Sequence, residues 1–144
     1  MTKKVLVVEN DRVIGELIAM VLRNEGYDVT LAQDYQRVPD SVALSRPDVV
    51  VIDSPDSREY GPGWDLAKRL HQRDHTIPMM MLTGQVKDTL EVGITDRGKL
   101  FAAAITKPFD IDILVSQIEA ITRSGLPSQG DPFSEGCQEY PRLP

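Results

Sequence analysis

Near its start the chain reads Val5-Leu6-Val7-Val8-Glu9-Asn10-Asp11, a run of four apolar residues that ends in polar ones. A continuous run rich in β-branched residues is typical of a strand that is covered on both faces. Apolar residues then recur at helical spacing as far as Gly26, at Val13, Ile14, Leu17, Ile18, Val21 and Leu22. This order predicts a buried strand followed by an amphipathic helix.

The same alternation repeats along the chain. Further strands are predicted at residues 27–31, 49–52, 79–82 and 101–105. Helices are expected between them: a short one beginning near Pro39, one around residues 64–70, and one from an Asp110 cap to Gly125. Residues 85–99 carry the weakest pattern because Gly93 and Gly98 interrupt them. Five strands that alternate with helices predict an α/β fold, a parallel sheet with helices on both faces.

Composition limits the functional classes. The 144 residues suit one domain, and the net charge of −6 argues against a broad basic face for nucleic acid. We find no apolar run of membrane-spanning length and no signal-peptide pattern, and the single Cys137 cannot form an internal disulfide. We therefore expect a cytoplasmic domain at residues 1–124 that binds neither membrane nor nucleic acid. Residues 125–144, rich in proline and glycine, are expected to form a flexible tail.

Polar residues follow four of the five predicted strands. In open parallel sheets, ligands bind beyond the carboxyl ends of the strands, so residues far apart in sequence meet there. Carboxylates, a hydroxyl and an ammonium group together suit a divalent cation and a phosphoryl group. Asp53 is then a candidate nucleophile, with Thr83 and Lys107 as candidates for holding the transferred group. The residues at these ends are Glu9, Asn10 and Asp11, then Asp53, then Thr83 and Gly84, then Lys107 and Pro108.

The histidines and the run of methionines could in principle take part in chemistry, but the sequence favours structural or surface positions for them. His71 and His75 lie at the end of a helix and in the next loop, where we expect them at the surface. Met79-Met80-Met81 is expected to be strand core. The sequence contains no Gly-rich phosphate loop, which leaves nucleotide hydrolysis unsupported.

Four segments, in this order, resemble the receiver domain of two-component response regulators. They are Val5 to Asp11, Pro47-Asp48-Val49-Val50-Val51-Ile52-Asp53, Ile77 to Gly84, and Ile105-Thr106-Lys107-Pro108-Phe109. The resemblance covers roughly residues 3–123. It implies a flavodoxin-like, doubly wound, five-stranded parallel sheet in the order 2-1-3-4-5.

The resemblance also implies a phosphorelay function. Asp53 would accept a phosphoryl group from a histidine kinase or a histidine phosphotransfer protein. Thr83 and Lys107 would contact the phosphoryl oxygens, and the small Gly84 would leave the group open to water. The bond before Pro108 would be cis. Magnesium would be held by Glu9, Asn10, Asp53 and the backbone carbonyl of Pro55.

The chain departs from the family at several positions. Asn10 stands where the family has the second acidic residue, so the Mg²⁺ site is expected to be weakened by the loss of a charge. Asp11 is expected to enter the helix and point elsewhere. Ala104 stands where the family carries an aromatic switch residue. The loop after Asp53 is also longer than the family pattern.

Two functional hypotheses follow. The first is a stand-alone response regulator, a phosphoacceptor rather than an enzyme, that signals to a downstream protein through protein contacts. The alternative is a pseudo-receiver, an interaction module that acts without phosphorylation, as Asn10 and Ala104 suggest. A flavodoxin-like cofactor binder is the weakest alternative. The last two helices are a candidate homodimer surface.

Overall fold

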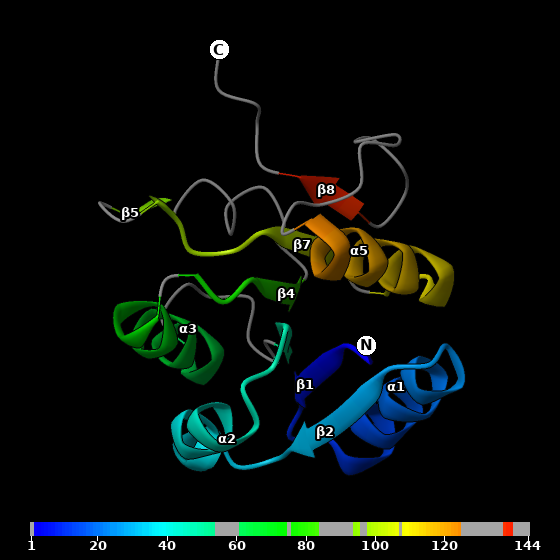
Figure 1. Ribbon diagram of the computed structural model, residues 1–144, viewed down its shortest axis with the longest axis horizontal. Helices are drawn as coiled ribbons and strands as arrows, with labels where there is room; N and C mark the ends of the chain where they lie inside the picture. Colours follow the sequence, from blue (N-terminus) through cyan, green and yellow to red (C-terminus); the bar gives the residue numbers. More distant parts are fainter. Residues whose placement is uncertain are drawn as a thin grey trace.

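The computed structural model describes residues 2–53, 61–74, 76–83, 94–95, 98–106, 108–124 and 137–139. A central sheet separates two layers of helices, with α2 and α3 on one side and α1 and α5 on the other (Figure 1). The helices and the short 3₁₀ helix η1 are α1 (Arg12–Asn24), η1 (Tyr35–Arg37), α2 (Val38–Ser45), α3 (Pro62–Arg73) and α5 (Ile111–Ser124). The strands are β1 (Lys4–Val8), β2 (Asp28–Ala32), β3 (Val49–Asp53), β4 (Met79–Thr83), β5 (Ile94–Thr95), β6 (Gly98–Lys99), β7 (Ala103–Thr106) and β8 (Cys137–Glu139).

The parallel sheet has the predicted strand order. Its strands run β2-β1-β3-β4-β7, and every neighbouring pair among them is parallel. Because β7 is the fifth strand of this set, the doubly wound order 2-1-3-4-5 is confirmed. In the same described part of the chain, β5 and β6 form a separate two-stranded sheet within the segment where the sequence pattern was weakest.

A sixth strand was not predicted. β8 pairs antiparallel with β7, so part of the Pro- and Gly-rich tail extends the sheet. Its pairing depends on main-chain hydrogen bonds along the edge of β7, which is why an apolar sequence period gave no sign of it. The start of the fifth strand was also placed too early: β7 begins at Ala103, and Phe101 turns into the core beside α3.

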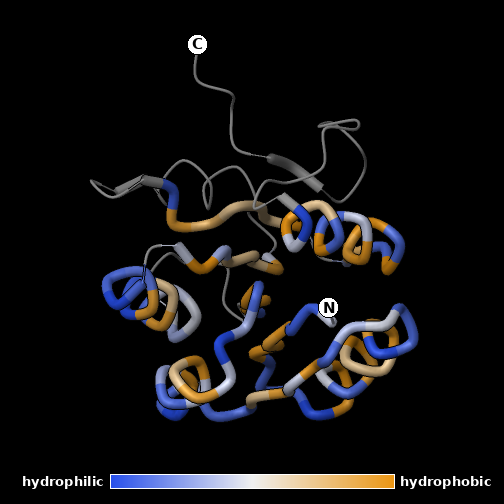
Figure 2. The backbone as a smooth tube through the Cα atoms, viewed as in Figure 1, coloured by the Kyte–Doolittle hydropathy of each residue, from blue (hydrophilic) through white to orange (hydrophobic). Residues whose placement is uncertain are grey.

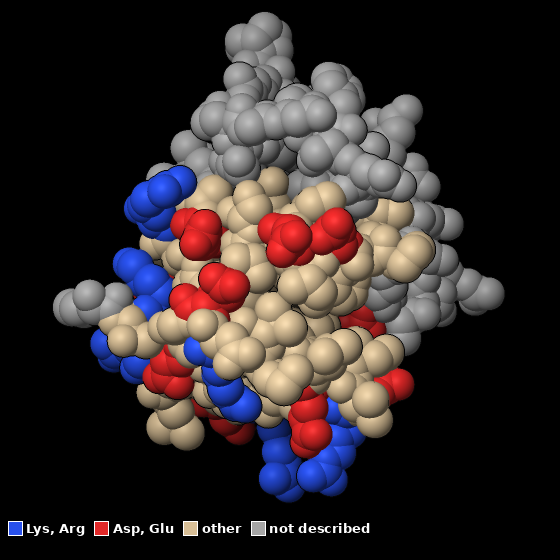
Figure 3. Space-filling model, turned by 90° about the vertical axis from the view of Figure 1, so that its right-hand side faces the viewer, with Lys and Arg blue, Asp and Glu red and all other residues tan. Residues whose placement is uncertain are grey.

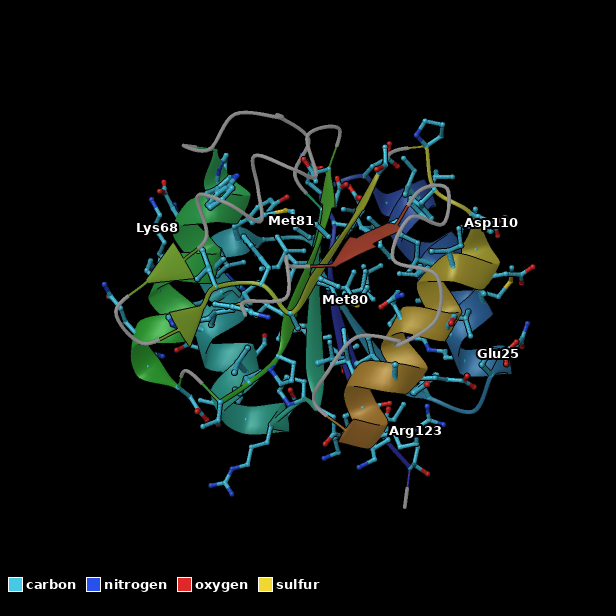
Figure 4. All side chains as sticks on the ribbon, turned by 90° about the horizontal axis from the view of Figure 1, so that it is seen from above. Glu25, Lys68, Met80, Met81, Asp110 and Arg123 are labelled. Carbon is cyan, nitrogen blue, oxygen red and sulfur yellow. The ribbon has the colours of Figure 1, made fainter. Side chains whose placement is uncertain are left out.

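Alternate residues of the buried strands supply two cores. In β4, Met81 packs on the α2 and α3 side and Met80 on the α1 and α5 side. Figure 4 shows these two side chains on opposite sides of the sheet. Figure 2 shows the apolar residues turned toward the sheet on the helices of both layers. The expectation that the three consecutive methionines are strand core is confirmed.

The helices follow their sequence signals, with one exception. Pro39 lies in the first turn of α2, where a proline is tolerated, as predicted. The ring of Trp64, near the start of α3, packs edge-to-face on Phe101 with centroids 5.3 Å apart. The prediction of a surface position for His71 is wrong. His71 is not at the end of its helix, because α3 continues to Arg73. It lies seven residues, or two helical turns, after Trp64, so both side chains are on the buried face of α3. His75 lies outside the described residues.

In the described part of the chain, no helix has both the length and the apolar character that a bilayer crossing requires.

Candidate functional site

The carboxyl ends of three adjacent strands bring Glu9, Asp53 and Thr83 together. β1 and β3 pair with Val8 beside Ile52, so the next residues, Glu9 and Asp53, follow side by side. β3 and β4 pair with Asp53 beside Leu82, and Thr83 comes next. The structure thus confirms that these three distant residues share one edge of the sheet.

All three side chains are buried, although each carries polar atoms. No more than 4% of the surface of any of them is exposed. Each takes part in polar interactions, yet the buried Oδ1 atom of Asp53 has no hydrogen-bond donor within the described residues. Two carboxylates placed next to each other away from water repel, and a bound cation relieves that repulsion.

The turn after β1 fixes the orientation of the acidic residues. The Asp11 amide donates to Glu9 Oε1 at 2.9 Å. Asp11 itself caps α1, because its Oδ1 accepts from the amides of Val13 and Ile14 at 3.0 and 3.1 Å. The side chain of Asp11 is thus engaged at the start of the helix, as the prediction that it points elsewhere requires, but Asp11 caps α1 and does not lie within it. Asn10, between them, is exposed.

The cluster fits a magnesium site with two charged ligands. Within the described residues, three or more His, Cys, Asp or Glu side chains do not gather into a metal-binding group. The acidic ligands for Mg²⁺ would therefore be Glu9 and Asp53. Asn10, the predicted neutral ligand, is exposed in the turn after β1. This donor set is all oxygen, which is what Mg²⁺ prefers, and Oδ1 of Asp53 offers a buried acceptor.

Several predicted site residues cannot be placed. Pro55, Gly84 and Lys107 lie outside the described residues. Thr83 is paired with Thr106, the residue before Lys107, so β7 reaches the same edge of the sheet. Pro108 is exposed, and the bond that precedes it involves a residue that is not described.

Ala104, the position expected to carry a switch aromatic in related proteins, is fully buried. It lies opposite Met81 in the register of β4 and β7 and packs in the core on the α3 side. A methyl group has no rotamer that could swing between two positions, so this residue supplies no moving ring.

Tyr35 is a site residue that the sequence analysis missed. Its hydroxyl donates to the backbone carbonyl of Asp53 at 3.0 Å. Burial, and then the charges of Asp53 and Glu9, raise the pKa of Tyr35 from the ordinary 10.0 to about 12. The sequence does carry a signal for it, because Tyr35 follows the second strand and so lies at the same edge of the sheet as the other strand ends.

The raised pKa of Tyr35 predicts a loss of stability at alkaline pH. Since the folded state holds the phenol neutral, its contribution is complete below pH 10 and is lost as pH rises from 10 toward 12. A Tyr35→Phe variant should therefore show a shallower fall in the free energy of unfolding over this range. Urea unfolding at a series of pH values measures it. Equal slopes in the two proteins would contradict the prediction.

Comparison with known proteins agrees with this geometry. The sequence profile of the response regulator receiver domain matches residues 5–119. This chain belongs to the response regulator receiver family. A probable transcriptional regulatory protein of Mycobacterium tuberculosis, TcrX, is 35% identical over 83% of this chain and 49% of its own length. The response regulator MprA of Mycolicibacterium vanbaalenii is 31% identical over 90% of this chain and 54% of its own.

Solved receiver domains have the same fold. The receiver domain of the Francisella response regulator 1452 superposes with a TM-score of 0.69 at 28% identity, over 86% of this chain and 99% of that one. The HemR receiver domain of Leptospira biflexa superposes with a TM-score of 0.70 at 25% identity, over 88% of this chain and 99% of that one. Receiver domains act in two-component phosphorelays with histidine kinases and bind Mg²⁺ at the phosphorylation site. The chain spans about half the length of the curated relatives it matches.

Proposed function

We propose that this receiver domain accepts a phosphoryl group on Asp53 and signals through the protein contacts it makes in the phosphorylated state. The donor is a histidine kinase or a histidine phosphotransfer protein in the cytoplasm. The observation that carries the proposal is the buried cluster of Glu9, Asp53 and Thr83 at the edge where a parallel sheet binds ligands. The domain is a phosphoacceptor rather than an enzyme with a separate substrate.

The chemistry assigns a distinct task to each residue. A carboxylate oxygen of Asp53 forms a bond to the phosphorus of the donor phosphohistidine, whose phosphorus–nitrogen bond breaks and leaves the electron pair on the imidazole nitrogen. The Thr83 hydroxyl and the Lys107 ammonium hold the oxygens of the transferred group. When bound at Glu9, Asn10 and Asp53, Mg²⁺ supplies positive charge that offsets the repulsion between carboxylates and phosphoryl group.

Asn10 weakens the metal site in this proposal, because it replaces a charged ligand with a neutral one. An Asn10→Asp variant should therefore bind Mg²⁺ about tenfold more tightly, which corresponds to about 1.4 kcal/mol. Titration of Mg²⁺ against the fluorescence of Trp64 or by calorimetry measures the change. Asp11→Asn is the control, since Asp11 caps the helix and should leave the affinity unaltered. An unchanged affinity in Asn10→Asp would show that residue 10 does not face the metal.

A pseudo-receiver is the second candidate, and two observations favour it. Asn10 lowers the charge of the metal site, and the buried Ala104 supplies no aromatic switch. In that case the fold serves as an interaction module whose contacts do not depend on phosphorylation.

Intact mass spectrometry separates the two candidates. The full chain is incubated with acetyl phosphate and millimolar Mg²⁺, and the mass of one added phosphoryl group is followed over time. The phosphoacceptor proposal predicts the adduct with Mg²⁺ and its loss when Mg²⁺ is chelated. A chain that stays unmodified with both reagents present would support the pseudo-receiver.

The outer face of α1 is a suitable docking surface for the donor protein. Val13, Leu17 and Met20 are exposed, Val13 to 77%, on the side opposite the buried Gly15, Ala19 and Leu22 of the same helix. Figure 3 shows the α1 and α5 side of the molecule, where uncharged side chains cover a broad area. The helix begins directly after the acidic turn, so a protein docked on this stripe lies beside Asp53.

A Leu17→Glu variant should separate docking from chemistry. With a histidine kinase that phosphorylates the wild-type chain, the rate of transfer is expected to fall on the order of tenfold, because a charge enters an apolar contact. Labelling by acetyl phosphate should be unchanged. Leu44→Glu is the matched control, since Leu44 is 87% exposed on α2, in the other helical layer. Equal kinase rates in Leu17→Glu and the wild type would place the donor elsewhere.

A further inference from the structure

We propose that Tyr35 is the residue that positions the phosphoacceptor, by fixing the backbone of Asp53 at the point where β3 ends. The inference rests on the proposed function, since it assigns Tyr35 a task in the transfer to Asp53. Tyr35 acts through the main chain of Asp53 and does not itself contact the reacting atoms.

The hydrogen bond joins two segments that are 18 residues apart. Tyr35 Oη donates to the Asp53 carbonyl at 3.0 Å, and the ring packs against the core on the α2 and α3 side. In the sheet, β1 lies between β2, which precedes Tyr35, and β3, which ends in Asp53. The Tyr35 side chain therefore links the segment after the edge strand β2 to the central strand β3, and it passes the carboxyl end of β1, which Glu9 follows.

The turn that presents Tyr35 is itself held in place. Asp34 accepts at Oδ1 from the Gln36 amide at 3.0 Å, and its carbonyl accepts from the Arg37 amide at 3.1 Å. These two hydrogen bonds stabilise the 3₁₀ turn η1, and they therefore restrain the backbone from which the Tyr35 side chain projects. The half-buried ring loses little further freedom when the hydroxyl makes its bond.

The Asp53 carbonyl has a second close neighbour in α3. A Cβ atom built on Gly63 would lie 3.4 Å from this carbonyl oxygen and 3.2 Å from Ile52 Cγ2, so the first turn of α3 rests against the end of β3. The carbonyl is thus located between the phenol hydroxyl and the start of the helix. A carbonyl fixed in this way limits rotation about the Cα–C bond of Asp53 and so holds the Cα atom from which the side chain projects.

Fixing this backbone matters because in-line transfer depends on the position of the attacking oxygen. A displacement of about 1 Å in a reacting group can lower a rate by about a hundredfold. Asp53 is the last residue of β3, and it pairs with Leu82 of β4. The Tyr35 hydrogen bond adds a side-chain restraint to the strand pairing that already holds this end of β3.

The test compares Tyr35→Phe with Tyr27→Phe in the full chain. The phenylalanine keeps the packed ring at position 35 and removes only the hydroxyl, whereas Tyr27 precedes β2 at the opposite end of that strand. Phosphoramidate serves as the donor, at saturating Mg²⁺, and intact mass gives the rate of phosphorylation against donor concentration. Urea unfolding at neutral pH confirms that both variants are folded.

We expect the maximal rate of Tyr35→Phe to fall about three- to tenfold, the effect of losing one hydrogen bond. The donor concentration at half-maximal rate and the Mg²⁺ affinity should stay within about twofold of wild type. A role confined to stability would leave the maximal rate of folded protein unchanged. Tyr27→Phe should match the wild type throughout.

The outcomes distinguish this inference from the proposed function. If the wild-type chain is labelled and Tyr35→Phe keeps the same maximal rate, the inference is overturned and the phosphoacceptor role stands. If the rate falls equally in Tyr27→Phe, the effect is not specific to Asp53 and the inference is overturned as well. If the wild-type chain takes up no phosphoryl group, both fail together.

Discussion

An Asp53→Asn variant is expected to take up no phosphoryl group under conditions in which the wild-type chain is labelled. The amide has no carboxylate oxygen to attack phosphorus, and it removes one of the two charges that would hold Mg²⁺. The readout is the intact mass after incubation with acetyl phosphate and Mg²⁺. The matched control is Asp48→Asn, which changes an aspartate just before β3, at the opposite end of the strand from Asp53. Labelling of Asp53→Asn at the wild-type level would place the phosphoryl group on another residue.

The same variant has a signature in unfolding experiments. Without Mg²⁺, Asp53→Asn should be at least as stable as the wild type, since the substitution removes a negative charge beside the buried Glu9. With Mg²⁺, only the wild type should gain stability, by about 1.4 kcal/mol at a concentration near ten times its dissociation constant. An equal gain in both proteins would mean that the ion binds elsewhere.

A Glu9→Gln variant is expected to bind Mg²⁺ about a hundredfold more weakly. Opposite unit charges about 4 Å apart attract by about 4 kcal/mol at an effective dielectric constant near 20, and desolvation offsets part of this. A remainder of about 2.7 kcal/mol is a factor of about 100 in affinity. Glutamine keeps an oxygen that can accept from the Asp11 amide, so the turn after β1 should persist.

Calorimetric titration of Mg²⁺ measures this effect, with Glu16→Gln as the control. Glu16 lies exposed on α1, where it pairs with Arg12 at 3.1 Å, and its removal should leave Mg²⁺ affinity within about twofold. If Glu9→Gln binds Mg²⁺ as tightly as the wild type, the buried carboxylate of Glu9 has a purely structural role.

The parallel sheet could be predicted from the sequence because strands that are buried on both faces consist of continuous apolar runs. Val5 to Val8 and Val49 to Ile52 have this form, and both are strands with fully buried side chains. β8 carried no such run, because a strand added at an edge can be held by main-chain bonds alone. Phe101 was assigned to a strand on composition, whereas tertiary packing beside Trp64 turns it into the core.

The sequence could predict those site residues that directly follow a buried strand. The shared edge of Glu9, Asp53 and Thr83 follows from parallel register alone. Tyr35 could not be assigned its contact in this way, because its hydroxyl reaches across a neighbouring strand and only the fold shows which carbonyl it meets. The sequence also showed that Asn10 and Ala104 differ from the usual residues of the family. It could not show the effect of Asn10 on Mg²⁺ affinity or how Ala104 packs in the core.

Fluorine NMR with beryllofluoride and Mg²⁺ tests most directly whether Asp53 is the residue that carries the phosphoryl group, in a site that requires Mg²⁺. Beryllofluoride replaces a phosphoryl group on a carboxylate without any group transfer, so the result does not depend on the donor. The account predicts bound fluorine resonances for the wild-type chain that require Mg²⁺ and that are absent in Asp53→Asn. A wild-type spectrum that contains only the free species at millimolar Mg²⁺, or bound resonances that persist in Asp53→Asn, would contradict it.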